Sequence, residues 1–169
     1  FALSERSVLI PVEFAGAVKP SLIILPALFL LGGLGNQAGF WDNAINYGLF
    51  AVIGFLGSLL AGAVLTPILL PWLPGRAFSV KGFFTGLVIG FVFLIIQGVD
   101  LHLWSGRIYS LAWLLLISGA SAFLAMNFTG SSTYTSLSGV KKEMRFAVPL
   151  EGGAILLGLS LWIVSRYIT

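Results

Sequence analysis

Long apolar runs alternate with short polar connections along the chain, and five such runs occur. They cover about residues 16–34, 44–70, 82–99, 108–126 and 150–168. A run of roughly 20 apolar residues matches the thickness of the hydrocarbon core of a bilayer. In lipid only helices and closed barrels satisfy all backbone polar groups, and barrel strands alternate polar and apolar residues, which these runs do not. The pattern predicts an all-α integral membrane protein, a bundle of about five transmembrane helices.

The composition agrees with a membrane environment. Of 169 residues, 58% are hydrophobic and only 9% are charged, whereas soluble domains carry about 25% charged residues. The lipid bilayer is therefore the first partner that we expect. Cysteine is absent, which excludes thiolate metal sites, iron–sulfur clusters, disulfides and cysteine nucleophiles in this chain. The net charge of +3 gives no support to nucleic-acid binding.

Small residues recur at helical spacing within two of the runs. Such residues let the backbones of membrane helices approach closely. We expect helix packing at five glycines, two in the second run and three in the third: Gly54, Gly57, Gly82, Gly86 and Gly90. Pro26, in the middle of the first run, predicts a kink.

The positive charges indicate an orientation in the membrane. With five spans, seven of the nine Lys and Arg residues fall on one side: Arg6, Lys19, Arg76, Lys81, Lys141, Lys142 and Arg145. The other two, Arg107 and Arg166, fall on the opposite side. Cytoplasmic connections carry the excess of Lys and Arg. We therefore expect a multi-pass protein of the cytoplasmic (inner) membrane with its N-terminus in the cytoplasm and its C-terminus outside.

The fourth connection, residues 127–149, reads NFTGSSTYTSLSGVKKEMRFAVP and is the longest polar stretch. Ser136 or Ser138 would cap a short helix over 140–147, which Pro149 would end. Loops of this length are often functional, so we predict a partner-docking loop. The alternative is a solvated connection whose bases set the topology and touch lipid head groups. Its docking residues would be Asn127, Thr129, Ser131, Ser132, Thr133, Tyr134, Thr135, Ser136, Ser138, Lys141, Lys142, Glu143 and Arg145.

Isolated polar residues near the span ends favour no active site. Lys19, Gln97 and Glu151 are expected at the interface, where Glu151 would pair with one of the bases 141, 142 or 145. His102, the one histidine, is expected on the surface, because one histidine and one aspartate make a poor metal site. We identify no catalytic, metal-binding or cofactor-binding residue in this chain.

Two segments resemble a known family. The string MNFTGSSTYTSLSGVKKEMR, residues 126–145, resembles the signature loop in the membrane domain of the mercury-methylation corrinoid proteins. The string SERSVLIPVEFAGAVKP, residues 4–20, resembles the junction between that family's corrinoid domain and its first span. The five predicted spans and the cytoplasmic N-terminus agree with the family as well.

The resemblance implies a corrinoid-dependent methyltransferase that converts Hg(II) to methylmercury. In that family an upstream cytoplasmic domain holds a cobalamin-type corrinoid beneath a cap-helix cysteine, and a ferredoxin-like [4Fe–4S] partner returns the cobalt to Co(I). Because this chain has no cysteine, we carry over none of the methyl-transfer residues. Residues 1–15 would be the interfacial junction to the upstream domain. Residues 16–169 would anchor that domain and offer the loop 127–149 to it or to the ferredoxin.

Two other functions remain open from the residues alone. A small transporter or channel would need polar groups around a cavity, or else a hydrophobic substrate. An accessory subunit of a respiratory or lipid-metabolising complex would co-purify with a quinone, a haem or a lipid.

Overall fold

The described residues form long helices and short connections. The computed structural model describes residues 8, 10–35, 38–131 and 137–168, with the backbone alone at 128–131, 137 and 140. Five helical rods in this part are long and apolar enough to cross a membrane, which confirms the predicted fold class. The first rod is the single helix α2 (Ile10–Gly32), and the second rod is Phe40–Leu69. The other three rods are the single helices α6 (Phe78–Gln97), α7 (Trp104–Ser131) and α8 (Leu137–Ser165).

The second rod, Phe40–Leu69, contains two π-helical segments. In order it comprises α3 (Phe40–Asn43), η1 (Ala44–Gly48), α4 (Leu49–Leu59), η2 (Leu60–Leu65) and α5 (Thr66–Leu69). The first π segment lies where this rod crosses α2. A Cβ atom on Gly48 would come 2.5 Å from the carbonyl oxygen of Phe29, so a glycine is needed for the two backbones to meet there.

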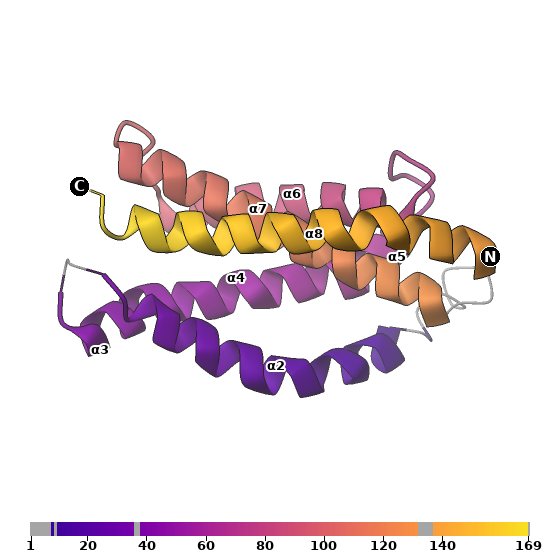
Figure 1. Cartoon of the computed structure of the whole chain (residues 1–169), viewed down its shortest axis with the longest axis horizontal. Helices are drawn as coiled ribbons and strands as arrows, with labels where there is room; N and C mark the ends of the chain where they lie inside the picture. The colour runs from indigo at the N-terminus through magenta and orange to yellow at the C-terminus, as the bar shows by residue number, and fades with distance from the viewer. Residues whose placement is uncertain (1–7, 9, 36–37, 132–136, 169) are drawn as a thin grey trace.

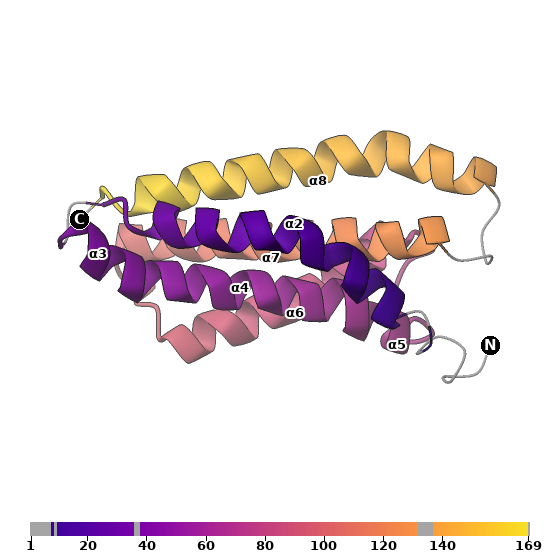
Figure 2. The same ribbon diagram turned by 90° about the horizontal axis from the view of Figure 1, so that it is seen from below.

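Helix α7 is the centre of the bundle (Figures 1 and 2), and its most extensive contacts are with α6 and α8. Its Trp113 lies between Phe93 of α6 and Trp162 of α8, at ring-centroid distances of 5.2 and 5.3 Å. Trp113 and Trp162 are both almost fully buried. The aromatic cluster therefore joins three of the five rods at the core.

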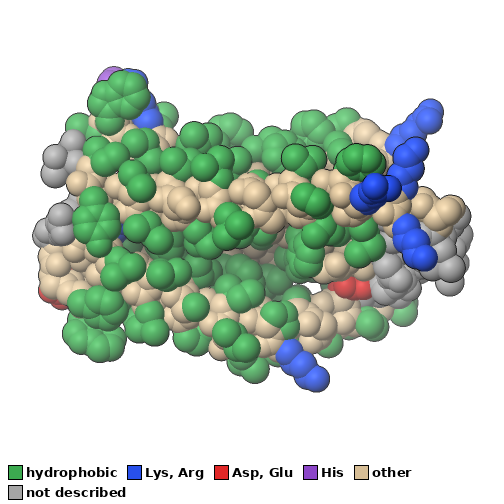
Figure 3. Space-filling model, in the orientation of Figure 1, with side chains coloured by type: hydrophobic (Ala, Val, Ile, Leu, Met, Phe, Trp, Pro, Cys, Tyr) green, Lys and Arg blue, Asp and Glu red, His purple; other side chains and the backbone are tan. Residues whose placement is uncertain are grey.

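Apolar side chains cover most of the outer surface that Figure 3 displays. Ile95 and Ile96 are each 77% exposed, and Leu150 is 74% exposed. In water such a surface would drive aggregation, whereas lipid chains solvate it. Helix α2 contains Pro20 and Pro26 and is visibly curved along its length (Figure 1), which agrees with the expected kink.

Charge divides the two ends of the bundle. The basic end comprises the first turns of α2, the connection 70–77 between α5 and α6, and the start of α8. The C-terminal end comprises residues 33–35, 38–39, 98–103 and 166–168. Most of the Lys and Arg side chains visible in Figure 3 lie toward the basic end.

The predicted loop 127–149 is mostly helical, so that prediction was wrong in its extent. Helix α7 continues to Ser131, and α8 begins at Leu137 and runs through Pro149 without a break. A proline removes one hydrogen bond and clashes with the preceding turn, but membrane helices tolerate it when neighbouring groups compensate. The short helix expected over 140–147 is instead the first part of the last span. Similarly, α2 begins at Ile10, inside the predicted junction 1–15.

The α6–α7 contact generates a prediction about stability. A Cβ atom on Gly86 would lie 2.6 Å from the Cα of Ser118, whereas one on Gly152 would meet nothing within 4 Å. We expect Gly86→Ala to destabilise the bundle by about 1–3 kcal/mol through overpacking. Gly152→Ala should be neutral or slightly stabilising, because alanine favours helices. Thermal unfolding in detergent measures both variants, and equal melting temperatures would contradict the close contact.

Candidate functional site

Three bases form an exposed patch at the start of α8. Lys141, Lys142 and Arg145 are exposed, and their i, i+1 and i+4 spacing places them on one side of the helix. We call these three residues the basic patch. It lies at the same end of the bundle as the start of α2 (Figure 1).

Glu143, between these bases in sequence, makes an internal contact. One carboxylate oxygen accepts a 2.9 Å hydrogen bond from the backbone N–H of Ser79, in the first turn of α6. A carboxylate there satisfies one of the free N–H groups of the helix and complements its dipole. Nearby, the ammonium group of Lys81 donates a 2.8 Å hydrogen bond to the carbonyl of Leu70. These contacts fasten the ends of α5, α6 and α8, so Glu143 supports the basic patch instead of extending it.

The remaining residues of the predicted docking loop are spread over different environments. Asn127 and Ser138 are exposed. Thr129 and Ser131 belong to the last turns of α7, with only their backbone described. Five predicted docking residues lie outside the described part of the chain: Ser132, Thr133, Tyr134, Thr135 and Ser136.

The five predicted packing glycines lie at helix contacts. Cβ atoms on Gly82 and Gly86 would meet α7 at 2.5 and 2.6 Å. One on Gly90 would lie 3.0 Å from Leu114, also on α7. A Cβ atom on Gly54 would lie 2.6 Å from the ring of Trp113, and one on Gly57 would lie 3.1 Å from Ile89 of α6.

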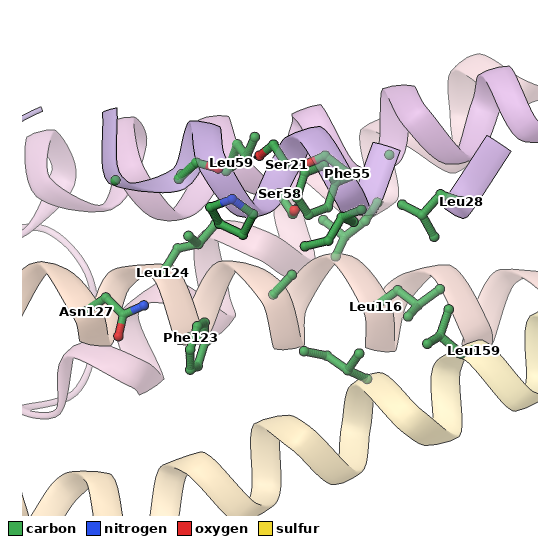
Figure 4. A pocket seen from close by; sticks show the side chains of 18 of the residues that line it. Ser21, Leu28, Phe55, Ser58, Leu59, Leu116, Phe123, Leu124, Asn127 and Leu159 are labelled. Atoms are coloured by element: carbon green, nitrogen blue, oxygen red, sulfur yellow. Dashed lines mark hydrogen bonds between the residues drawn. The ribbon is translucent and has the colours of Figure 1, made fainter. Parts of the chain in front are cut away.

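A large apolar cavity, which the sequence did not predict, lies among α2, α4, α7 and α8 (Figure 4). Its volume is about 560 Å³, within the range of small-molecule sites. Small residues create the space, among them Gly16, Ala17 and Ala120. Two hydroxyls in the wall are already satisfied, because Ser21 donates to the carbonyl of Ala17 and Ser58 to that of Phe55, each at 2.6 Å. Glu13 and Asn127 are the other polar residues of the wall, and the rest of it is apolar, so an apolar occupant fits it best.

Glu151 is a buried carboxyl group inside the last span. It is only 6% exposed, and neither carboxylate oxygen has a hydrogen-bond partner among the described residues. The expected pairing with Lys141, Lys142 or Arg145 is therefore wrong. Because α8 begins at Leu137, Glu151 lies fourteen residues into the helix, on the side facing α7. An ionisable side chain at such a position is a functional candidate.

Comparisons with known proteins give no further assignment. No family model, curated protein or solved structure matches this chain. Within the described residues, no group of three or more His, Cys, Asp or Glu side chains comes together to hold a metal ion. With no cysteine in the chain, its residues do not fit the cap ligand of a corrinoid, and no step of methyl transfer is derived from them.

Replacing Glu143 and replacing Glu151, which lie on the same helix, should have opposite effects on stability. Glu151→Leu should raise the melting temperature in detergent, because it removes an unsatisfied buried group that costs about 1–3 kcal/mol. Glu143→Leu should lower the melting temperature, because the Ser79 N–H loses its acceptor. Thermal unfolding compares the two variants directly. If Glu151→Leu destabilised as much as Glu143→Leu, Glu151 would have a partner in the folded protein.

Proposed function

We propose that this chain is a membrane domain that anchors a corrinoid methyltransferase module of the mercury-methylation type at the cytoplasmic face of the bilayer. The proposal rests on the resemblance of residues 126–145 and 4–20 to that family. One structural observation supports it: the two resembling segments lead into α8 and α2 at the same end of the bundle. A module attached before α2 would therefore lie beside the basic patch.

The residues of this chain would contribute position and electrostatics to that function. Anchoring confines the module to the membrane surface and raises its effective concentration near other membrane-bound components. The basic patch would attract an acidic surface on the corrinoid module or on a ferredoxin-like [4Fe–4S] protein. Methylation of Hg(II) would be carried out by the corrinoid module and not by these helices.

Reversing the charge of the basic patch tests this docking role. In the full-length protein, the triple variant Lys141→Glu, Lys142→Glu, Arg145→Glu should weaken association with the ferredoxin-like partner by about tenfold or more, since three exposed charge pairs of about 0.5 kcal/mol each are lost and replaced by repulsion. The control is Arg107→Glu, at the opposite end, which should leave association unchanged. Binding to the immobilised ferredoxin-like partner is measured by surface plasmon resonance at two salt concentrations.

Two outcomes would contradict the docking role. One is unchanged association in the triple variant, with its membrane helices still folded by circular dichroism. That result would favour contact between the bases and anionic lipid head groups. The other is a reporter fusion that places residues 132–136 outside the cell, because a cytosolic module would then never meet the patch.

The apolar cavity favours a second candidate function, binding or transfer of a lipophilic molecule. Its apolar wall, its volume of about 560 Å³ and its place within the membrane-spanning rods all suit such a ligand. Of the residues that line the cavity, only Glu13 is ionisable.

Filling the cavity tests this second function. Gly16 lines the cavity, and Gly152 does not, yet an added Cβ meets nothing within 4 Å at either position. Gly16→Leu should reduce binding of a pyrene-labelled fatty acid severalfold, because the new side chain occupies apolar space. Gly152→Leu should leave binding unchanged. Equal binding by both variants, measured by fluorescence in detergent, would exclude this cavity as the binding site.

A further inference from the structure

A second, smaller cavity lies at the C-terminal end and differs in character from the apolar one. Its volume is about 210 Å³. It lies where the ends of α6 and α8, the start of α7 and the segment η1 meet. Polar side chains from all four elements line it: Tyr47, Gln97, Ser105, Tyr109, Ser165 and Arg166.

Arg166 is held firmly in the wall of this polar cavity. The residue is only 5% exposed. Its Nε donates a hydrogen bond to the carbonyl of Leu34 at 3.3 Å, and its guanidinium carbon lies 3.1 Å from the ring centroid of Tyr47. A Cβ atom on Gly35 would come 3.0 Å from Nη2, so a glycine there leaves room for the guanidinium. These contacts fix the position of the cation but do not neutralise it.

The charge of Arg166 lacks a counter-ion in the described part of the chain. Its Nη2 atom is buried without a hydrogen-bond partner, and the ionisable groups that face it are the tyrosines Tyr47, Tyr109 and Tyr167. A buried charge without a partner is costly. Water in the cavity would leave this charge uncompensated.

Two further polar side chains in the wall of the polar cavity, Gln97 and Tyr109, contact each other. The side-chain N–H of Gln97 donates to the hydroxyl oxygen of Tyr109 at 2.6 Å, which leaves the hydroxyl hydrogen of Tyr109 to donate elsewhere. The amide oxygen of Gln97 is buried without a partner. The cavity is thus lined by one cationic residue, Arg166, and by one neutral residue with a hydrogen to donate, Tyr109.

We propose that this polar cavity binds an oxyanion, a carboxylate or a phosphate, on the guanidinium group of Arg166 with the hydroxyl of Tyr109 as the second donor. Guanidinium groups match the geometry of carboxylate and phosphate oxygens. The cavity holds several water volumes of about 30 Å³ each but is smaller than typical drug-sized sites, so the bound group is small. It is either a free solute or the phosphate of a lipid head group. This site is independent of the anchoring function.

Thermal stability of the full chain in maltoside detergent tests the site. Ligands that bind the native state raise the melting temperature in a saturable way. We titrate acetate, inorganic phosphate and dioleoyl phosphatidic acid at fixed ionic strength. Saturation by acetate or phosphate supports a free solute, and saturation by phosphatidic acid alone supports a lipid head group. A response to none of the three overturns the proposal.

Arg107 provides a matched control. It lies at the same end, its Nε also donates to a backbone carbonyl at 2.8 Å, and its guanidinium stacks 5.1 Å from the ring centroid of Trp104, but it is exposed. Arg166→Gln should weaken oxyanion binding by about tenfold or more, the usual effect of losing a charge-assisted hydrogen bond. Arg107→Gln should leave binding unchanged. Equal losses in both variants would overturn the proposal.

A near-isosteric variant keeps the test valid if Arg166→Gln fails to fold. Gln97→Glu supplies a carboxylate within the same cavity, where it would compensate Arg166 internally. We expect a higher melting temperature without ligand and no further rise with acetate, phosphate or phosphatidic acid. A Gln97→Glu protein that still responded like the unmodified chain would overturn the site.

Discussion

Close approach of the α6 and α7 backbones is the contact on which the rest of the bundle depends. Between lipid-solvated helices, burying leucine gains little, because lipid is as apolar as the protein interior. Association therefore rests on small residues and on hydrogen bonds between helices. Gly82 and Gly86 let α6 meet α7 at backbone distance. The hydroxyl of Ser121 donates to the carbonyl of Gly82 at 2.7 Å, and Thr85 lies 2.7 Å from Thr66 of α5.

With α7 fixed at the centre, the other helices differ in how tightly they are held. Trp113 and Trp162 join α8 to α7 near the C-terminal end. Helix α2 buries only Ala17, Ser21 and Gly32, and it packs mainly on the second rod. The loose fit of a curved α2 against α7 and α8 leaves the apolar cavity. The same property that makes α2 the peripheral helix therefore creates the largest candidate ligand site.

The five spans could be predicted because the length of each apolar run matches the thickness of the hydrocarbon core of a bilayer. Their ends could not, since Ser, Thr and Lys between residues 127 and 149 are equally compatible with a loop and with helical turns that extend beyond the hydrocarbon. The apolar run alone puts Glu151 near the start of the last span, whereas the helix begins fourteen residues earlier, at Leu137. The apolar cavity and the setting of Arg166 depend on contacts between residues distant in sequence, such as Arg166 with Leu34, and no local pattern encodes them.

The positive charges at the two ends illustrate how burial changes the meaning of one residue type. Lys141, Lys142 and Arg145 are exposed, so water and salt screen them, and their attraction for an acidic surface weakens as the salt concentration rises. Arg166 counts as a single charge in the same sequence tally, yet it is 5% exposed and held by Leu34 and Tyr47. There the charge is poorly screened, so a hydrogen bond that it makes is stronger than the same bond at the surface. A charge count treats all of these residues alike, whereas burial distinguishes an exposed patch of bases from a guanidinium group that lines a cavity.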